Sequence, residues 1–343
     1  MDIKIRTTRF IKPSNPTPEN LHHFKLSALD QLAPATYTSM IFYYKISDDV
    51  DVSDRCGQLV KSLSEVLNSY YPLAGRITQN RLEVDCRDQG VKYLETQVSA
   101  RLDDFLSHGS KTDHVGQLIG SPDDQVTNPL VTVQVNVFEC GSLVIGVTAS
   151  HKVTDAYNLA RFVNEWASMN RTGCSNGSYA PSFDNLGFIF PPLDIPLLEP
   201  EPIKFDPKPV ILTKRYVFNK TAISNLRAKA GPNNTTCSRV TLVTSLIWNT
   251  LITIDHVKSG RFRDCLLVPA MSLRGKIGSP AFPLYDADFG WGKPCWVTAA
   301  ARGFDMITLM DDKHGDGVEA WVSLNEKDMH LFEQDQDIIA FTT

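Results

Sequence analysis

The prolines of this chain are unevenly spread, and their distribution constrains the fold more than any other sequence feature. Eight of the 20 prolines fall within residues 181–209. Because proline lacks a backbone N–H and fixes φ, this stretch cannot form a central strand or a regular helix. It predicts a crossover, residues 181–209, between an N-terminal domain, 1–180, and a C-terminal domain, 210–343. Two domains also suit the length, at about 150 residues per domain.

The N-terminal half mixes helical and strand patterns. An amphipathic helix is predicted from apolar residues at helical spacing, which are Leu59, Leu63, Val66, Leu67 and Tyr70. Residues 131–138 alternate in polarity and predict a half-buried strand, and residues 143–149 predict a second, more apolar strand. Ser150 and His151 follow, and then a helix whose buried face would carry Leu159, Phe162, Val163 and Trp166.

The C-terminal half shows the same mixture. Strands are predicted at residues 211–218, 265–273 (ending at Arg274), 296–300, 306–310 and 318–324. Thr221 and Ser238 are expected to cap the two helices between the first two of these strands. The longer helix is expected to bury Val240, Val243, Ile247, Leu251 and Ile254. The last residues suggest a further helix. The fold class is therefore α/β (α+β).

Charge and missing motifs exclude several classes of protein. The net charge of -5 argues against a nucleic-acid binder, which usually carries a basic surplus. No apolar run approaches the ~18 uninterrupted residues of a membrane span, and none follows the N-terminal charges as in a secretory signal. A G-x-S-x-G elbow, a P-loop and a Rossmann G-x-G-x-x-G are all missing, which disfavours serine hydrolases, P-loop nucleotidases and dinucleotide-dependent dehydrogenases.

The cysteines and one acidic segment bear on redox state and metals. Seven cysteines are dispersed without a C-x-x-C, which favours free thiols and a cytoplasmic location. Residues 312–317 imitate the start of a calcium loop, but Ser323 stands where that loop needs a bidentate Glu. We therefore expect a polar hairpin turn there and no metal site.

The segment His151-Lys-Val-Thr-Asp155 lies where a buried strand meets an amphipathic helix. A histidine with a pKa near ~6.5 is mostly neutral at cytosolic pH and can accept a proton. Alternatively, His151 is a buried histidine that only packs. Asp155 could orient His151, or it could cap the helix that follows.

A second unusual segment is Asp288-Phe-Gly-Trp-Gly292. Gly290 and Gly292 flank Trp291, which suggests a tight backbone turn against a large ring. The segment could be a packing loop, and that interpretation is compatible with a supporting role in a functional site.

Taken together and in this order, the two segments resemble those of the plant BAHD acyl-CoA-dependent acyltransferases. The resemblance spans nearly the whole chain and includes further collinear segments, which are Lys12-Pro-Ser-Asn-Pro-Thr-Pro18, Leu26-Ser-Ala-Leu-Asp30, Tyr71-Pro-Leu-Ala-Gly-Arg76, Ser272-Leu-Arg274, Phe282-Pro-Leu-Tyr285 and Gly315-Asp-Gly-Val-Glu-Ala-Trp321.

The resemblance implies a two-domain fold related to chloramphenicol acetyltransferase, with a channel at the domain interface. An acyl-CoA co-substrate and a small-molecule alcohol would enter this channel from opposite faces. His151 would be the general base, and Asp288 a second essential, catalytic residue. Asp155 would turn away from His151 and pair with Arg274, and the loop of Gly290, Trp291 and Gly292 would support the channel. No tightly bound cofactor is implied, and the residues that contact CoA are unknown.

The family members most similar in the KPSNPTP, LDQL and Cys237-Ser-Arg-Val240 segments imply an activity. It is transfer of acetyl from acetyl-CoA to a hydroxyl of an alkaloid or similar specialised metabolite, by a cytoplasmic monomer. The basic residues Lys258, Arg261 and Arg263 could meet CoA phosphates, or they could belong to a solvated loop.

One departure from the family pattern is large. Only residues 275–281 separate Ser272-Leu-Arg274 from the FPLYDADFGWG segment, where family members carry a long stretch. The second domain is therefore expected to be truncated, with an exposed sheet edge. The alternative to an active enzyme is a catalytically impaired family member, or a non-enzymatic binding or interaction protein that dimerises through this edge.

Overall fold

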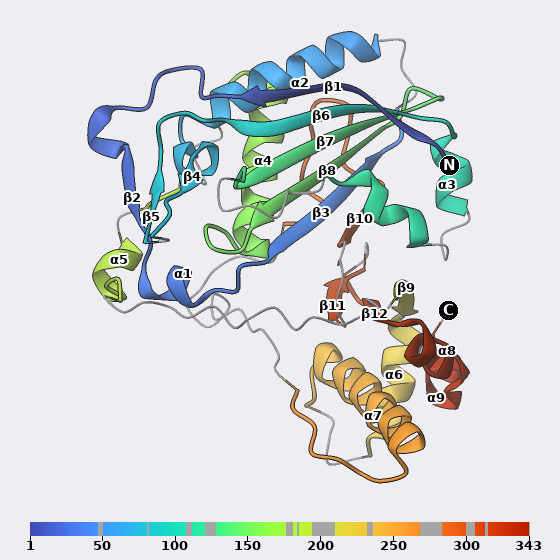
Figure 1. Ribbon diagram of the computed structural model, residues 1–343. Coiled ribbons are helices and arrows are strands. Elements are labelled where there is room, and N and C mark those ends of the chain that lie inside the picture. Colours follow the sequence, from blue (N-terminus) through green and yellow to red (C-terminus); the bar gives the residue numbers. More distant parts are fainter. Residues whose placement is uncertain are drawn as a thin grey trace. The chain divides into compact units, whose positions relative to one another are not determined.

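The computed structural model describes residues 1–46, 51–80, 82–107, 112–120, 128–175, 181–183, 185–193, 210–231, 236–267, 283–299, 306–312 and 315–342. The chain forms two compact units (Figure 1). The first contains Met1–Gly109, His114–Glu201 and Phe282–Ala300, and the second contains Ser110–Asp113, Pro202–Ala281 and Ala301–Thr343. Each is described by itself, and the channel between domains stays a prediction from the resemblance.

A six-stranded mixed sheet is the scaffold of the first unit, in the order β1-β6-β7-β8-β3-β10. Its strands are β1 (Ile3–Ile11), β3 (Tyr37–Tyr44), β6 (Val91–Val98), β7 (Val131–Phe138), β8 (Leu143–Ser150) and β10 (Trp296–Ala299). The β6–β7 pair is parallel, and the other pairs are antiparallel. The predicted strands 131–138 and 143–149 are thus confirmed as the neighbours β7 and β8.

The prediction that residues 131–138 are half-buried is wrong, because every residue of β7 is buried. Two of its three polar residues, Gln134 and Asn136, find partners inside the protein instead of facing water, whereas the Thr132 hydroxyl is buried with no hydrogen-bond partner among the described residues. The Asn136 amide donates to the carbonyl oxygens of Leu118 and Val144, both at 2.9 Å. Its oxygen accepts from Gln134 Nε2 at 2.7 Å and from Thr96 Oγ1 at 2.8 Å. This network makes an alternating strand compatible with burial on both faces.

Two long helices pack against each other on one face of this sheet (Figure 1). They are α2 (Val52–Val66) and α4 (Ala156–Thr172), and both were predicted from their apolar spacing. Trp166 of α4 is fully buried and donates its indole N–H to Leu59 O of α2 at 3.1 Å. The contact joins the two predicted apolar faces.

Shorter elements complete the first unit. A small sheet has the order β2-β5-β4, built from β2 (His23–Lys25), β4 (Arg76–Ile77) and β5 (Glu83–Asp85). The short helices are α1 (Ala28–Leu32), α3 (Leu102–Ser107) and α5 (Asn185–Ile189), with 3-10 turns η1 (Glu19–Leu21), η2 (Tyr71–Ala74) and η3 (Thr112–Leu118). Helix α5 lies inside the proline-rich stretch, in a run free of proline, so the crossover is not wholly irregular.

The segment 283–299 belongs to the first unit, although the predicted boundary placed it in the C-terminal domain 210–343. Strand β10 pairs with β3, with Val297 opposite Phe42. The chain therefore returns to the N-terminal sheet after the second unit has begun. A boundary drawn from proline content alone had no means of predicting such a return, because strand pairing is a tertiary contact.

The second unit is smaller, with a three-stranded antiparallel sheet in the order β11-β12-β9. Its elements are β9 (Ile211–Phe218), α6 (Lys220–Lys229), α7 (Arg239–Ser259), β11 (Met306–Asp311), β12 (Val318–Asn325), α8 (Glu326–Gln334) and α9 (Gln336–Phe341). The predicted strands 211–218, 306–310 and 318–324 are confirmed here, and the described part of the predicted strand 296–300 is β10 of the first unit. Its core gathers Phe218, Val243, Ile247, Val322 and Phe332.

Several local predictions for the second unit need correction. Asn219, not Thr221, caps α6, because its side chain lies before the first turn and accepts from Ala222 N. Ser238 caps α7 as predicted, but Val240 is 50% exposed because it lies on the face turned away from the core. Residues 265–267, predicted to start a strand, are irregular and exposed, and residues 268–274 lie outside the described residues.

Helix α7 is, within the described ranges, the one helix long and apolar enough to cross a membrane by length and composition alone. Val243 and Ile247 of this helix pack in the core of the second unit.

Candidate active site

His151 follows the last residue of β8 and precedes α4, which is the strand-to-helix junction predicted from sequence. Its backbone N–H donates to Thr36 O at 2.8 Å, and Ser150 N donates to Leu130 O at 2.8 Å. The residue as a whole is half-buried. Within the described part of the chain, neither ring nitrogen has a hydrogen-bond partner. A neutral imidazole at this position keeps a lone pair available to accept a proton.

The turn after His151 is fixed by the backbone. Val153 N and Thr154 N both donate to Ser150 O at 3.2 Å. Asp155 then caps α4, accepting from Asn158 N at 2.8 Å with extended backbone geometry. The capping interpretation of Asp155 is confirmed. The predicted pair with Arg274 stays a prediction, because Arg274 lies outside the described residues.

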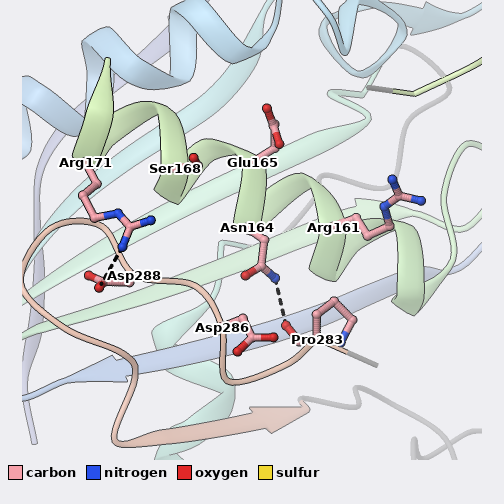
Figure 2. A pocket seen from close by; sticks show the side chains of 8 residues that line it. All are labelled: Arg161, Asn164, Glu165, Ser168, Arg171, Pro283, Asp286 and Asp288. Atoms are coloured by element: carbon pink, nitrogen blue, oxygen red, sulfur yellow. Dashed lines mark hydrogen bonds and ion pairs between the residues drawn. The ribbon is translucent and has the colours of Figure 1, made fainter. Parts of the chain in front are cut away.

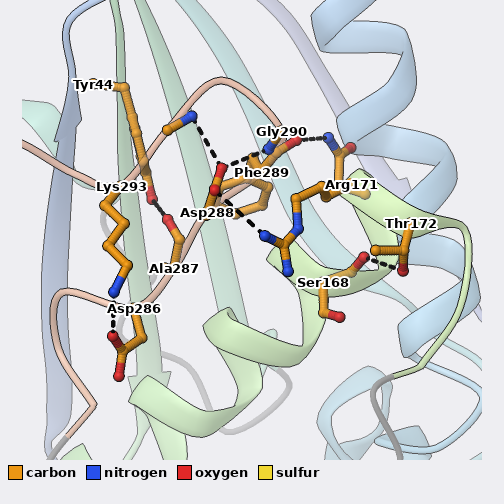
Figure 3. Close-up of polar contacts among 12 residues, drawn as sticks. Tyr44, Ser168, Arg171, Thr172, Asp286, Ala287, Asp288, Phe289, Gly290 and Lys293 are labelled. Atoms are coloured by element: carbon orange, nitrogen blue, oxygen red, sulfur yellow. Dashed lines mark hydrogen bonds and ion pairs between the residues drawn. The ribbon is translucent and has the colours of Figure 1, made fainter.

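Asp288 organises the backbone of its own loop (Figure 3). One carboxylate oxygen accepts from Gly290 N at 2.9 Å and from Gly292 N at 3.0 Å, and the other lies 3.5 Å from Arg171 of α4. Gly290 has φ +107° and Gly292 has φ +99°, a region that residues with a Cβ rarely adopt. The tight turn predicted from the two glycines is confirmed.

Aromatic rings hold this loop against the helices. Phe289 is buried and meets Trp166 edge-to-face, with ring centroids 4.9 Å apart. Trp291 stacks on Phe289 at 5.6 Å, and the Arg55 guanidinium lies over the indole at 5.1 Å. The Tyr44 hydroxyl donates to Ala287 O at 2.8 Å, and burial raises the pKa of Tyr44 well above its ordinary value. The loop is therefore a packing element that joins α2, α4 and the sheet.

The prediction that Asp288 is catalytic needs correction on geometric grounds. Asp288 contacts Arg171 near the end of α4, whereas His151 precedes the start of this helix. A helix of 17 residues spans about 25 Å at 1.5 Å per residue. A group that touches the reacting atoms at His151 therefore cannot be Asp288, which is instead a positioning residue of the loop. Sequence reasoning missed Arg171 and Asn170, which also bind this loop, because polar residues at a helix end carry no distinguishing signal.

A polar cavity of about 210 Å³ lies between α4 and the residues before this loop (Figure 2). Its lining residues are Arg161, Asn164, Glu165, Ser168, Arg171, Pro283, Asp286 and Asp288. Asn164 closes one side by donating to Pro283 O at 2.8 Å. None of the lining residues belongs to the His151–Asp155 turn, so this cavity is separate from the histidine.

Two predicted features remain, the basic residues near the end of α7 and the acidic segment 312–317. In the second unit, Lys258 pairs with Asp328 at 2.6 Å and Arg263 pairs with Asp255, which favours the solvated-loop interpretation of this basic group. Asp312 accepts from Asp316 N at 3.1 Å within the turn between β11 and β12, as expected of a polar hairpin. Across the residues that the structure describes, no three His, Cys, Asp or Glu side chains are grouped as metal ligands.

Comparison with known proteins gives the same family as the motifs. The limonoid 21-O-acetyltransferase of Melia azedarach is 31% identical over 422 residues, covering 100% of this chain and 99% of that protein. The acetyl-CoA-benzylalcohol acetyltransferase of Clarkia breweri is 28% identical over 444 residues and covers 100% of both. A crystal structure of vinorine synthase superposes with a TM-score of 0.81 at 28% identity, covering 99% of this chain and 98% of that one. The curated vinorine synthase of Rauvolfia serpentina is 30% identical over 403 residues, with 94% of each chain covered.

These alignments also bear on the predicted truncation. They run over 422 and 444 residues, whereas this chain has 343, so the relatives carry several tens of residues that it lacks. The Transferase family matches in two stretches, residues 1–281 and 278–339, which meet where the sequence predicts the missing segment. With that family match over nearly all of its length, this chain belongs to the Transferase family, the BAHD acyl-CoA-dependent acyltransferases.

Proposed function

We propose that this protein transfers an acetyl group from acetyl-CoA to a hydroxyl of an alkaloid or a similar specialised metabolite, with His151 as general base. The observation that carries the proposal is the half-buried residue His151, held at the end of β8 by the His151–Thr36 backbone hydrogen bond. The acetyltransferases among the relatives support the donor. We also infer that the protein is cytoplasmic, from its dispersed cysteines, and that it is a monomer, because members of this family are typically single chains in solution.

The reaction needs help at one step, because a neutral alcohol is a poor nucleophile. His151 takes the hydroxyl proton while the oxygen attacks the thioester carbonyl. The C–S bond of the tetrahedral intermediate then breaks, and the CoA thiolate takes the proton back from the imidazolium. No metal and no acyl-enzyme are needed in this sequence.

The test is His151→Ala, assayed by release of CoA thiol with acetyl-CoA and a panel of alcohols, including benzyl alcohol and hydroxylated alkaloids. We expect kcat to fall by ~10²–10⁴-fold with an unchanged unfolding midpoint, since a positioned base contributes about this much. The matched control is His330→Ala, because His330 is an exposed histidine of α8 in the second unit. Undiminished transfer by His151→Ala would refute the assignment.

The missing segment supports an alternative to the active enzyme, which is a catalytically impaired family member or a non-enzymatic binding protein. The unfolding temperature measured with and without acetyl-CoA distinguishes the enzyme from this alternative, because a ligand that binds the native state raises the unfolding temperature. A rise at saturating acetyl-CoA supports the enzyme. No rise, together with no CoA release by the wild type on any alcohol, supports the impaired or non-enzymatic member.

A further inference from the structure

Lys152, the residue after His151, reaches across to helix α1. Its ammonium donates to Gln31 O at 2.9 Å. Gln31 lies in the last turn of α1, whose final carbonyl groups have no partner within the helix. A lysine that bonds such a carbonyl satisfies it with a charge-assisted hydrogen bond.

A second hydrogen bond joins the same two segments. The backbone N–H of His151 donates to Thr36 O, five residues beyond Gln31. The main chain of His151 and the side chain of Lys152 thus both end on the short segment 31–36. Between them they fix the position and the rotation of the turn that carries the imidazole.

Helix α1 is itself held in place. Ser27 and Asp30 form a reciprocal capping box at its start. Ala28 N donates to Phe190 O at 3.1 Å, which joins α1 to the end of α5 (Figure 1). Gln31 is 2% exposed, and its side-chain oxygen accepts from Leu193 N at 2.8 Å. The anchor of Lys152 is therefore bound both to the N-terminal segment and to the crossover.

The Gln31 side chain also carries a cost. Its Nε2 is buried and, within the described residues, has no hydrogen-bond partner. A buried donor without a partner costs about 1–3 kcal/mol, so stability alone does not favour glutamine at this position. A role in positioning gives a physical reason for this residue.

We propose that Lys152 and Gln31 are positioning residues that hold the His151 turn against α1 and so aim its imidazole. This inference rests on the proposed function, in which His151 must come within about 2.6–3.2 Å of the hydroxyl proton donor. A displacement of about 1 Å can cost ~10²-fold in rate. Neither residue touches the reacting atoms in this proposal.

The experiment compares Lys152→Met, which keeps the length of the side chain but removes the donor, with Lys152→Arg, which keeps a cationic donor. Gln31→Met removes the acceptor for Leu193 N and leaves the Gln31 carbonyl in place. Lys61→Met, on the exposed face of α2, is the matched control. Two quantities are measured, kcat and KM for acetyl-CoA, and the hydrogen exchange of the His151 amide by NMR.

In Lys152→Met we expect the His151 amide to exchange at least ~10-fold faster, because the turn opens locally more often. We expect kcat to fall by ~10–10²-fold with little change in the KM for acetyl-CoA. The substitution disturbs the position of the general base His151, whereas it leaves the binding of acetyl-CoA unchanged. Lys152→Arg should restore both, Gln31→Met should move both in the same direction by less, and Lys61→Met should move neither.

Wild-type exchange at His151 in Lys152→Met overturns the proposal, as does a loss of kcat that Lys152→Arg does not restore. If Lys152→Met does not fold, Lys152→Gln, which keeps a polar but shorter side chain, is measured in its place, and wild-type exchange at His151 in that variant overturns the proposal as well. If the wild type transfers no acyl group to any alcohol, the proposed function fails, and the exchange measurement still decides whether Lys152 and Gln31 hold the turn.

Discussion

At the scale of single residues, polar groups inside the first sheet decide what β7 tolerates. Asn136 is fully buried, and both its amide hydrogens and its oxygen are used, by Leu118 O, Val144 O, Gln134 and Thr96. Such a residue does not behave as a surface asparagine, because its partners are polar groups inside the protein and each of them loses a hydrogen bond when it is removed.

We therefore expect Asn136→Ala to lower the free energy of unfolding by roughly 2–4 kcal/mol, as several groups inside the protein each lose a hydrogen bond together. Chemical denaturation by urea checks this, with Asn158→Ala as the control, because Asn158 is an exposed residue of α4. An Asn136→Ala protein as stable as the control would show that water replaces the network.

At the scale of elements, the Asp288–Gly292 loop depends on backbone geometry that only glycine adopts cheaply. Gly290 has φ +107°, and a Cβ there would come within 3.7 Å of Arg171. Strain from the positive φ, not crowding, is the main obstacle to a side chain. Gly57 is the opposite case, since it lies within α2 and a Cβ there would meet nothing within 4 Å.

Gly290→Ala should therefore destabilise the protein by about 1–3 kcal/mol, the usual cost of a residue held in a sparsely populated backbone region. Gly57→Ala should stabilise it by about 0.5–1 kcal/mol, since alanine loses less backbone entropy than glycine within a helix. Unfolding midpoints of the two variants, measured side by side, should move in opposite directions. The same sign for both would contradict the assignment of strain to Gly290.

At the scale of the whole molecule, the two units differ in how completely their strands are paired. Strands β7 and β8 are buried along their length and have a neighbour on both sides. Within the described residues, β9 and β11 each pair only with β12, and most of their residues are half-buried. The segment that family members carry and this chain lacks falls before residue 282, and thus in or beside the second unit.

Hydrogen exchange should therefore be slowest in β7 and β8 and markedly faster in β9 and β11, because amides on single-partner edges open at lower free energy. Mass spectrometry of exchanged peptides measures this. Equal protection of β9 and β11 would contradict the prediction and would show that another chain covers these edges, and a concentration-dependent mass would identify that chain as a second copy.

The sequence by itself determined the family, the mixed fold class, the amphipathic helices α2 and α4, and the junction that carries His151, because local periodicity and collinear motifs are written in adjacent residues. The tertiary structure alone decided that β7 is buried on both faces, that residues 283–299 return to the first sheet, and that Asp288 lies a helix length from His151. Each of these depends on which distant segments pair and pack, and pairing partners leave no periodic signal in the chain. The proposed role of Lys152 also depends on the tertiary structure, since only its hydrogen bond to Gln31 distinguishes it from the other lysines of the sequence.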